Sequence, residues 1–136
     1  MGRTFQTLTK SEIVQINRRM IQQFGGVFFS GNENIHNPGS LEYLVSMIQG
    51  SAFDFDPYPN IIEKAALLAC RIITGHIFID GNKRTGMESC RLFLEINGYD
   101  LPIDNDIVIM ALQIAKNETT FLDFVEWLNN HTTSRE

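Results

Sequence analysis

The feature that most constrains the fold is a segment in the middle of the chain, residues 60–75, which is apolar nearly all round a helix. Its sequence, NIIEKAALLACRIITG, is rich in alanine and leucine. A helix that is hydrophobic on every side is stable in water only when other elements cover it. Gly75 is a typical terminator, since glycine readily takes the conformations that end helices. The rest of the chain must therefore surround this segment.

Five other segments repeat apolar residues at the three- and four-residue spacing of a helix. They are residues 9–24, 40–50, 83–97, 104–116 and 120–130. Thr9 and Glu12 form a capping-box pattern, and Ser40 is expected to cap the second segment. A chain of 136 residues with 43% apolar and 20% charged residues is typical of one globular domain. We expect an all-α fold over residues 1–136: a single-domain bundle of about six helices.

Two segments do not read as helices. Residues 25–39 are rich in glycine and asparagine and too long for a simple connector, which favours a functional loop. Residues 51–59 alternate apolar and acidic positions before two prolines, which predicts a short β-like flap. Its aromatic residues either pack inward or leave the flap edge free to pair with the main chain of a target protein. These aromatic residues are Phe53, Phe55 and Tyr58.

Composition also limits location and partners. No window approaches the roughly 20 apolar residues of a membrane span, and the first residues lack the apolar core of an export signal. Cys70 and Cys90 lie among apolar neighbours, as reduced thiols do. We therefore expect a cytoplasmic protein without a membrane partner. A net charge of −5 repels nucleic-acid phosphates. No direct nucleic-acid partner is expected, and any anion site must be local.

The densest cluster of reactive side chains is HIFIDGNKRT, residues 76–85, between the two central helices. A loop that enters a helix through glycine, here Gly81, leaves backbone N–H groups free at the positive end of the helix dipole. Phosphate binds readily at such places. Lys83 and Arg84 are at the wrong end of a helix for stability, and an anionic ligand would correct this mismatch.

Each polar side chain of this segment suits phosphate chemistry. Arg84 offers a planar fork to phosphate oxygens and Lys83 a point charge, while the amide of Asn82 can donate to an oxygen. Asp80 is a hard ligand for Mg²⁺, and His76 can accept a hydroxyl proton near neutral pH. Simpler interpretations are a capping histidine and an ordinary Asp-Gly turn. Outside this segment, Arg71 and Arg91 fit solvated or salt-bridged faces, and His36 and His131 fit the surface.

The segment resembles the active-site motif of the Fic/Doc superfamily, HxFx[DE]GNxR, and in particular the form HxFxDxNKRT of the Doc (death-on-curing) branch. The neighbouring helices and their FGG and NG endings are also similar. The resemblance implies an enzyme that uses ATP and Mg²⁺ to modify a hydroxyl of a protein. It implies that His76 is the general base, that Asp80 holds the metal, and that Asn82 and Arg84 bind phosphates.

Two departures from the Fic adenylyltransferases bear on the reaction. Lys83 stands where those enzymes have a second glycine, and Met87 where they have a second arginine. Both are similar to Doc toxins, which implies a kinase that transfers the γ-phosphate of ATP to a Ser, Thr or Tyr hydroxyl, typically of a translation elongation factor. Gly81 is the Fic-like choice, which keeps protein adenylyltransfer (AMPylation) as the alternative. A catalytically silent antitoxin-binding module is a further alternative.

The resemblance also implies an inhibitor. Doc toxins are inhibited by a separate antitoxin protein, whereas some Fic proteins carry an internal [ST]xxxE[GN] helix. The sole matching spacing here, Thr132 to Glu136, lacks the residue after the glutamate. A separate antitoxin is therefore expected.

Overall fold

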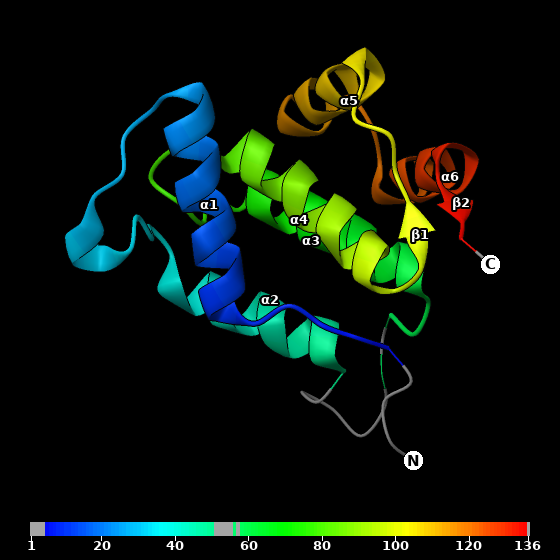
Figure 1. Cartoon of the computed structure of the whole chain (residues 1–136), viewed down its shortest axis with the longest axis horizontal. Helices are drawn as coiled ribbons and strands as arrows, with labels where there is room; N and C mark the ends of the chain where they lie inside the picture. Colours follow the sequence, from blue (N-terminus) through cyan, green and yellow to red (C-terminus); the bar gives the residue numbers. More distant parts are fainter. Residues whose placement is uncertain (1–4, 51–55, 57, 136) are drawn as a thin grey trace.

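The computed structural model describes residues 5–50, 56 and 58–135. Figure 1 shows a bundle of α-helices with one very small sheet. The helices are α1 (Lys10–Phe24), α2 (Pro38–Gln49), α3 (Ile61–Thr74), α4 (Asn82–Ile96), α5 (Asn105–Ala115) and α6 (Phe121–His131). A 3₁₀ turn spans Ser30–Asn32, and the antiparallel strands β1 (Tyr99–Asp100) and β2 (Thr133–Ser134) pair near the C-terminus. The expected all-α architecture with six helices is confirmed.

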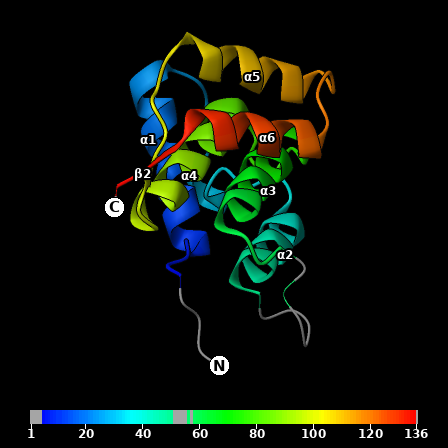
Figure 2. The same ribbon diagram turned by 90° about the vertical axis from the view of Figure 1, so that its right-hand side faces the viewer.

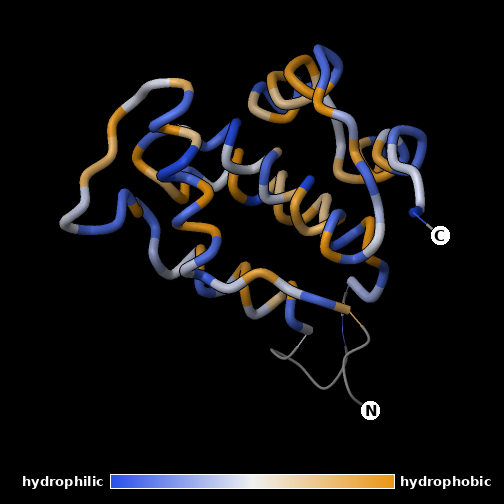
Figure 3. Tube along the Cα trace, viewed as in Figure 1, coloured by the Kyte–Doolittle hydropathy of each residue, from blue (hydrophilic) through white to orange (hydrophobic). Residues whose placement is uncertain are grey.

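The predicted central helix forms the middle of the molecule. α3 packs along α4, and α1, α2, α5 and α6 cover this pair from the outside (Figures 1 and 2). Gly86 permits the close approach of α3 and α4, because a Cβ at this position would lie 2.7 Å from Cγ1 of Ile73. Figure 3 shows the resulting pattern, in which apolar stripes of the helices alternate with hydrophilic ones. The buried cluster includes Ala65, Leu68, Ile72, Phe93, Phe124 and Leu128.

Local capping chemistry sets most helix boundaries. The capping box of Thr9 and Glu12 is present, and Asn60, Asp104 and Thr120 cap α3, α5 and α6 with their side chains. The prediction for Ser40 was wrong. α2 begins two residues earlier, with Asn37 at the N-cap and Pro38 in the first turn, where a missing N–H costs nothing.

The predicted flap, residues 51–59, lies mostly outside the described residues, as do Phe53 and Phe55. Of its described members, Asp56 pairs with the buried Lys64 of α3 at 2.6 Å, and the ring of Tyr58 packs on Phe121 of α6. Both contacts are near the N-terminal end of α3, whereas His76 follows its C-terminal end. A helix of 14 residues is about 21 Å long, so these two residues lie away from the motif.

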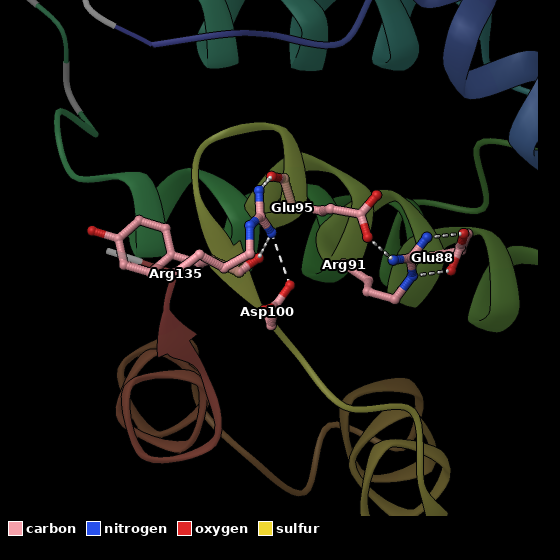
Figure 4. A network of polar contacts seen from close by, with 6 residues as sticks. Glu88, Arg91, Glu95, Asp100 and Arg135 are labelled. Carbon is pink, nitrogen blue, oxygen red and sulfur yellow. Dashed lines mark hydrogen bonds and ion pairs between the residues drawn. The ribbon is translucent and has the colours of Figure 1, made fainter.

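The C-terminal residues are tied to the end of α4. The guanidinium of Arg135 contacts the carboxylate of Asp100 at 2.8 Å and the carbonyl oxygen of Glu95 at 2.5 Å (Figure 4). Thr132, the first residue of the spacing compared above with the inhibitory helix of some Fic proteins, lies just after α6. Glu136, its last residue, is outside the described residues. Over the described residues, none of the helices has the length and hydropathy needed to cross a membrane.

Candidate active site

A groove of about 1050 Å³ lies between the C-terminal end of α1, the N-terminal end of α4 and one face of α5. Its cationic end is formed by the motif, and its opposite wall by apolar residues of α5 and the preceding segment, including Ile103, Val108 and Leu112. All six predicted site residues line this groove: His76, Asp80, Gly81, Asn82, Lys83 and Arg84. The structure therefore brings together the residues that the sequence had grouped.

The N-terminus of α4 has the features of an anion site. Gly81 is the N-cap with φ +79 and makes no side-chain cap. Within the described chain, the backbone N–H groups of Asn82, Lys83 and Arg84 have no hydrogen-bond acceptor, and Thr85 is the first to bond back, to the Gly81 carbonyl oxygen at 2.9 Å. Both cationic side chains are exposed. Free N–H groups and two cations at a helix start are suited to phosphate.

Gly81 is required by its surroundings as well as by its conformation. A Cβ at Gly81 would lie 2.8 Å from Cδ1 of Ile21 and 3.2 Å from Nδ2 of Asn17. A φ of +79 is also a conformation that side chains rarely adopt. The turn that opens α4 is therefore packed directly against α1.

The carboxylate of Asp80 is held by two backbone donors. Its Oδ1 accepts from the N–H of Gly81 at 2.8 Å, and its Oδ2 accepts from the N–H of Val27 at 3.0 Å. Gly26 allows this approach, since a Cβ there would lie 2.8 Å from Oδ2. Asp80 is partly exposed in the groove.

A single carboxylate suits a metal that comes with its substrate. The described residues contain no cluster of three or more potential metal ligands. Mg²⁺ is commonly bound by one or two carboxylates together with phosphate oxygens and water. Each Asp80 oxygen keeps a further lone pair, so the residues present fit a Mg²⁺ that would arrive with the phosphates of its substrate.

His76 is exposed at the rim of the groove, in the left-handed region with φ +47. Its carbonyl oxygen accepts from Nδ2 of Asn37 at 3.1 Å, and the same amide holds the carbonyl of Gly75 at 2.9 Å. Within the described chain, the imidazole makes no hydrogen bond. The backbone is thus fixed while both ring nitrogens stay free, which suits a group that exchanges protons with a ligand.

The side chain of Asn82 is used differently from the sequence expectation. Its Oδ1 accepts from the Phe78 N–H at 2.9 Å, and its Nδ2 donates to the Phe78 carbonyl at 2.8 Å. The amide therefore closes the motif loop on itself and keeps Phe78 buried. In this conformation, Asn82 offers an anion its backbone N–H.

Residues 25–37, which we call the clasp loop, bind the motif along its length. The Ile79 N–H donates to the Asn34 carbonyl at 2.8 Å, and the His36 N–H donates to the Ile77 carbonyl at 2.7 Å. An isolated antiparallel bridge pairs Ile35 with Phe78. The apolar stretch at the start of this loop is visible in Figure 3. The sequence predicted a functional loop at residues 25–39. The contacts with the motif give this loop a structural role, because they shape the site.

Two buried asparagines were missed by the sequence analysis. Asn17 of α1 donates through Nδ2 to the Asp80 carbonyl at 2.9 Å and to the Thr85 hydroxyl at 3.0 Å. Its Oδ1 accepts from Nδ2 of Asn34 at 3.0 Å. The one available signal was a polar residue on the apolar face of the first helix, between Ile16 and Met20.

Four charged or titratable residues that were not predicted as site residues do not line the groove: Arg71, Arg91, His36 and His131. Arg91 is engaged by Glu88 at 2.7 Å and by Glu95 at 3.0 Å, as Figure 4 shows. Arg71 is exposed, and its side chain has no ion pair within the described chain. His36 is exposed as expected. His131 is partly buried, because its ring stacks on Trp127 at a centroid distance of 3.9 Å.

Comparison with known proteins places the chain among relatives of one family. Residues 7–94 match the sequence model of a family described as the Fic/DOC family. A protein of Mycolicibacterium smegmatis named Toxin Doc is 33% identical over 92 residues, which are 68% of this chain and 71% of that protein. Protein kinase doc of Escherichia phage P1 is 27% identical over 107 residues, which are 76% of this chain and 80% of that protein.

Proposed function

This chain belongs to the Fic/DOC family, and we propose that it is a toxin that transfers the γ-phosphate of ATP to a Ser, Thr or Tyr hydroxyl of a target protein. The family and a relative named Protein kinase doc support a transferase-type enzyme. The observation that carries the proposal is the groove at the start of α4. An imidazole without a hydrogen bond, a positioned carboxylate and two cations without an ion pair meet there, as judged over the described residues.

In this proposal, the phosphates of ATP lie at the N-terminus of α4. They accept from the backbone N–H groups of Asn82, Lys83 and Arg84 and from the two cationic side chains. Asp80 would hold Mg²⁺, which would supply positive charge against the phosphates when bound. The apolar wall with Ile103, Val108 and Leu112 faces the less polar part of the nucleotide. Most of the rate of such a reaction comes from positioning and charge neutralisation.

His76 acts as the general base. Its free ring nitrogen takes the proton of the target hydroxyl as that oxygen attacks the γ-phosphorus. The new bond joins the hydroxyl oxygen to phosphorus, and the bond to the β,γ-bridging oxygen breaks. ADP leaves with the bonding electrons, and the imidazolium returns its proton to solvent.

The choice of γ-phosphate over adenylyl transfer rests on two groove residues. Lys83 adds a side chain and a charge where an adenylyltransferase has glycine. Met87 is 4% exposed and brings no charge to the groove. Both features favour the kinase, and they are the ones by which the chain is similar to the Doc branch. Gly81 favours the alternative, adenylyl transfer, because glycine at this position is similar to the Fic adenylyltransferases.

The partners follow from the Doc relatives, which imply a toxin–antitoxin system with a separate antitoxin. We propose that this chain acts in the cytoplasm, is neutralised by such an antitoxin, and modifies a component of translation such as an elongation factor. The clasp loop lies beside His76 and is the segment best placed to meet the target.

The proposed roles are tested by separating nucleotide binding from transfer. We expect His76→Ala to bind Mg·ATP with wild-type affinity in calorimetry and to lose transfer of label from γ-labelled ATP to lysate protein. Asp80→Asn should weaken Mg·ATP binding itself. His131→Ala is the matched control, because this histidine lies on α6 outside the groove. Undiminished transfer by His76→Ala would contradict the role of His76 as general base. If the wild-type protein, free of antitoxin, transferred no label, a catalytically silent binding module would be favoured.

A further inference from the structure

The guanidinium of Arg84 lies over the ring of Phe24, with 3.9 Å between Cζ and the ring centroid. Phe24 is the last residue of α1, and Arg84 lies in the first turn of α4, so the contact joins two walls of the groove. Phe24 is 50% exposed and lies outside the apolar core. Core packing therefore does not explain an aromatic residue at this position.

Stacking leaves the chemistry of Arg84 available. A cation above an aromatic ring is attracted to the face of that ring. The five N–H donors of a guanidinium point outward in the guanidinium plane, so stacking does not block them. Within the described chain, these donors of Arg84 have no acceptor. Arg91 is the opposite case, because two glutamates occupy its donors (Figure 4). The ring of Phe24 thus contacts the guanidinium and leaves its N–H donors available to bind phosphate.

We propose that Phe24 is a positioning residue that orders the Arg84 side chain in the groove before the nucleotide arrives. The inference rests on the proposed function, in which Arg84 binds ATP phosphates. An arginine side chain has rotamer entropy to lose on ordering, and a preorganised group binds more tightly since less entropy is lost at the moment of binding. Gly25 ends α1 directly after the ring, with φ +93, so the chain turns away and leaves Phe24 at the groove.

Mg·ATP binding should depend on this ring. We expect Phe24→Leu to weaken Mg·ATP binding about three- to ten-fold and Phe24→Tyr to restore it. Both should unfold within a few degrees of wild type because the position is half exposed. Tyr43→Leu is the matched control: it removes a ring that is 53% exposed on α2, outside the groove. Its binding should equal wild type.

A double-mutant cycle distinguishes positioning from direct contact. In an Arg84→Ala background, Phe24→Leu should cause no further loss of affinity, because the ring acts through the guanidinium. A full additional loss would mean that Phe24 contacts the nucleotide itself, which would overturn the proposal.

A second readout does not depend on nucleotide. In the free protein, ¹⁵N relaxation of the Arg84 side-chain Nε should report a more ordered group in wild type than in Phe24→Leu. Equal mobility in the two proteins would overturn the inference. If wild type binds no Mg·ATP, the proposed function fails, while the relaxation result still decides whether Phe24 orders Arg84.

Discussion

Asn17 of α1 and Asn34 of the clasp loop are both completely buried and share a hydrogen bond of 3.0 Å. Through Asn17 the pair also reaches the carbonyl of Asp80 and the hydroxyl of Thr85. Three segments that are distant in sequence are therefore joined beneath the groove by one polar network. Buried polar groups with all partners present make a structure specific, and those left without partners are costly.

We expect Asn17→Ala to lower the free energy of unfolding by about 1–3 kcal/mol, because Asn34 and the Asp80 carbonyl lose buried partners. Gln15→Ala, an exposed change on the same helix, should stay within about 0.5 kcal/mol of wild type. Urea unfolding followed by circular dichroism measures both. Equal stability of the two variants would contradict a structural role for the network.

The turn that opens α4 should tolerate only glycine. Gly81→Ala combines an unfavourable positive φ with a contact to Ile21, and we expect a loss of about 1–3 kcal/mol. Gly39→Ala is the matched control. It lies in α2 with open space around its Cα, so alanine should leave stability unchanged or raise it by up to about 1 kcal/mol. Thermal unfolding of the two variants gives the comparison.

The ion pair of Lys64 and Asp56 should respond asymmetrically to mutation. The side chain of Lys64 is 0% exposed and that of Asp56 is 25% exposed. Asp56→Ala leaves a buried cation without its partner and should cost about 3 kcal/mol. Lys64→Met replaces the cation by an apolar chain of similar length and leaves a partly solvated carboxylate, so its cost should be smaller. If Lys64→Met proved the more damaging change in chemical denaturation, this account of the pair would be wrong.

The two free thiols, Cys70 and Cys90, should lower the free energy of unfolding at alkaline pH. Burial raises the pKa of Cys70 from its ordinary value of 9.0 to about 11, against a smaller opposing effect of Arg71. Burial also raises the pKa of Cys90. Because the unfolded thiols ionise first, their contribution is fully present below about pH 9 and is lost as the pH rises toward 11. Urea unfolding between pH 7 and 10.5 should show this fall, and Cys70→Ala should make it shallower.

The sequence predicted the helices and the motif well because both depend on local chemistry. Apolar spacing and capping side chains predicted most helix ends to within one residue of their observed positions. The six predicted site residues of the motif line one groove. Ser40 failed as a cap because Pro38 could already occupy the first turn. The use of the Asn82 amide on Phe78 could not be predicted, since it depends on the fold of the loop.

The contacts between distant segments were beyond the sequence. The network of Asn17 with Asn34 and the support of Asp80 by Val27 join residues that only tertiary packing brings together. The stacking of Phe24 on Arg84 is of the same kind. A half-exposed phenylalanine at the end of an amphipathic helix is indistinguishable in sequence from one that packs in the core.

The central claim is that the transferred group is the γ-phosphate. The most direct measurement incubates the wild-type protein, Mg²⁺ and a bacterial lysate with ATP labelled at either the γ- or the α-phosphorus, and follows the label on protein. The account predicts label from γ-labelled ATP alone, and none with His76→Ala. Transfer of the α-label to protein would contradict it and assign adenylyl transfer instead.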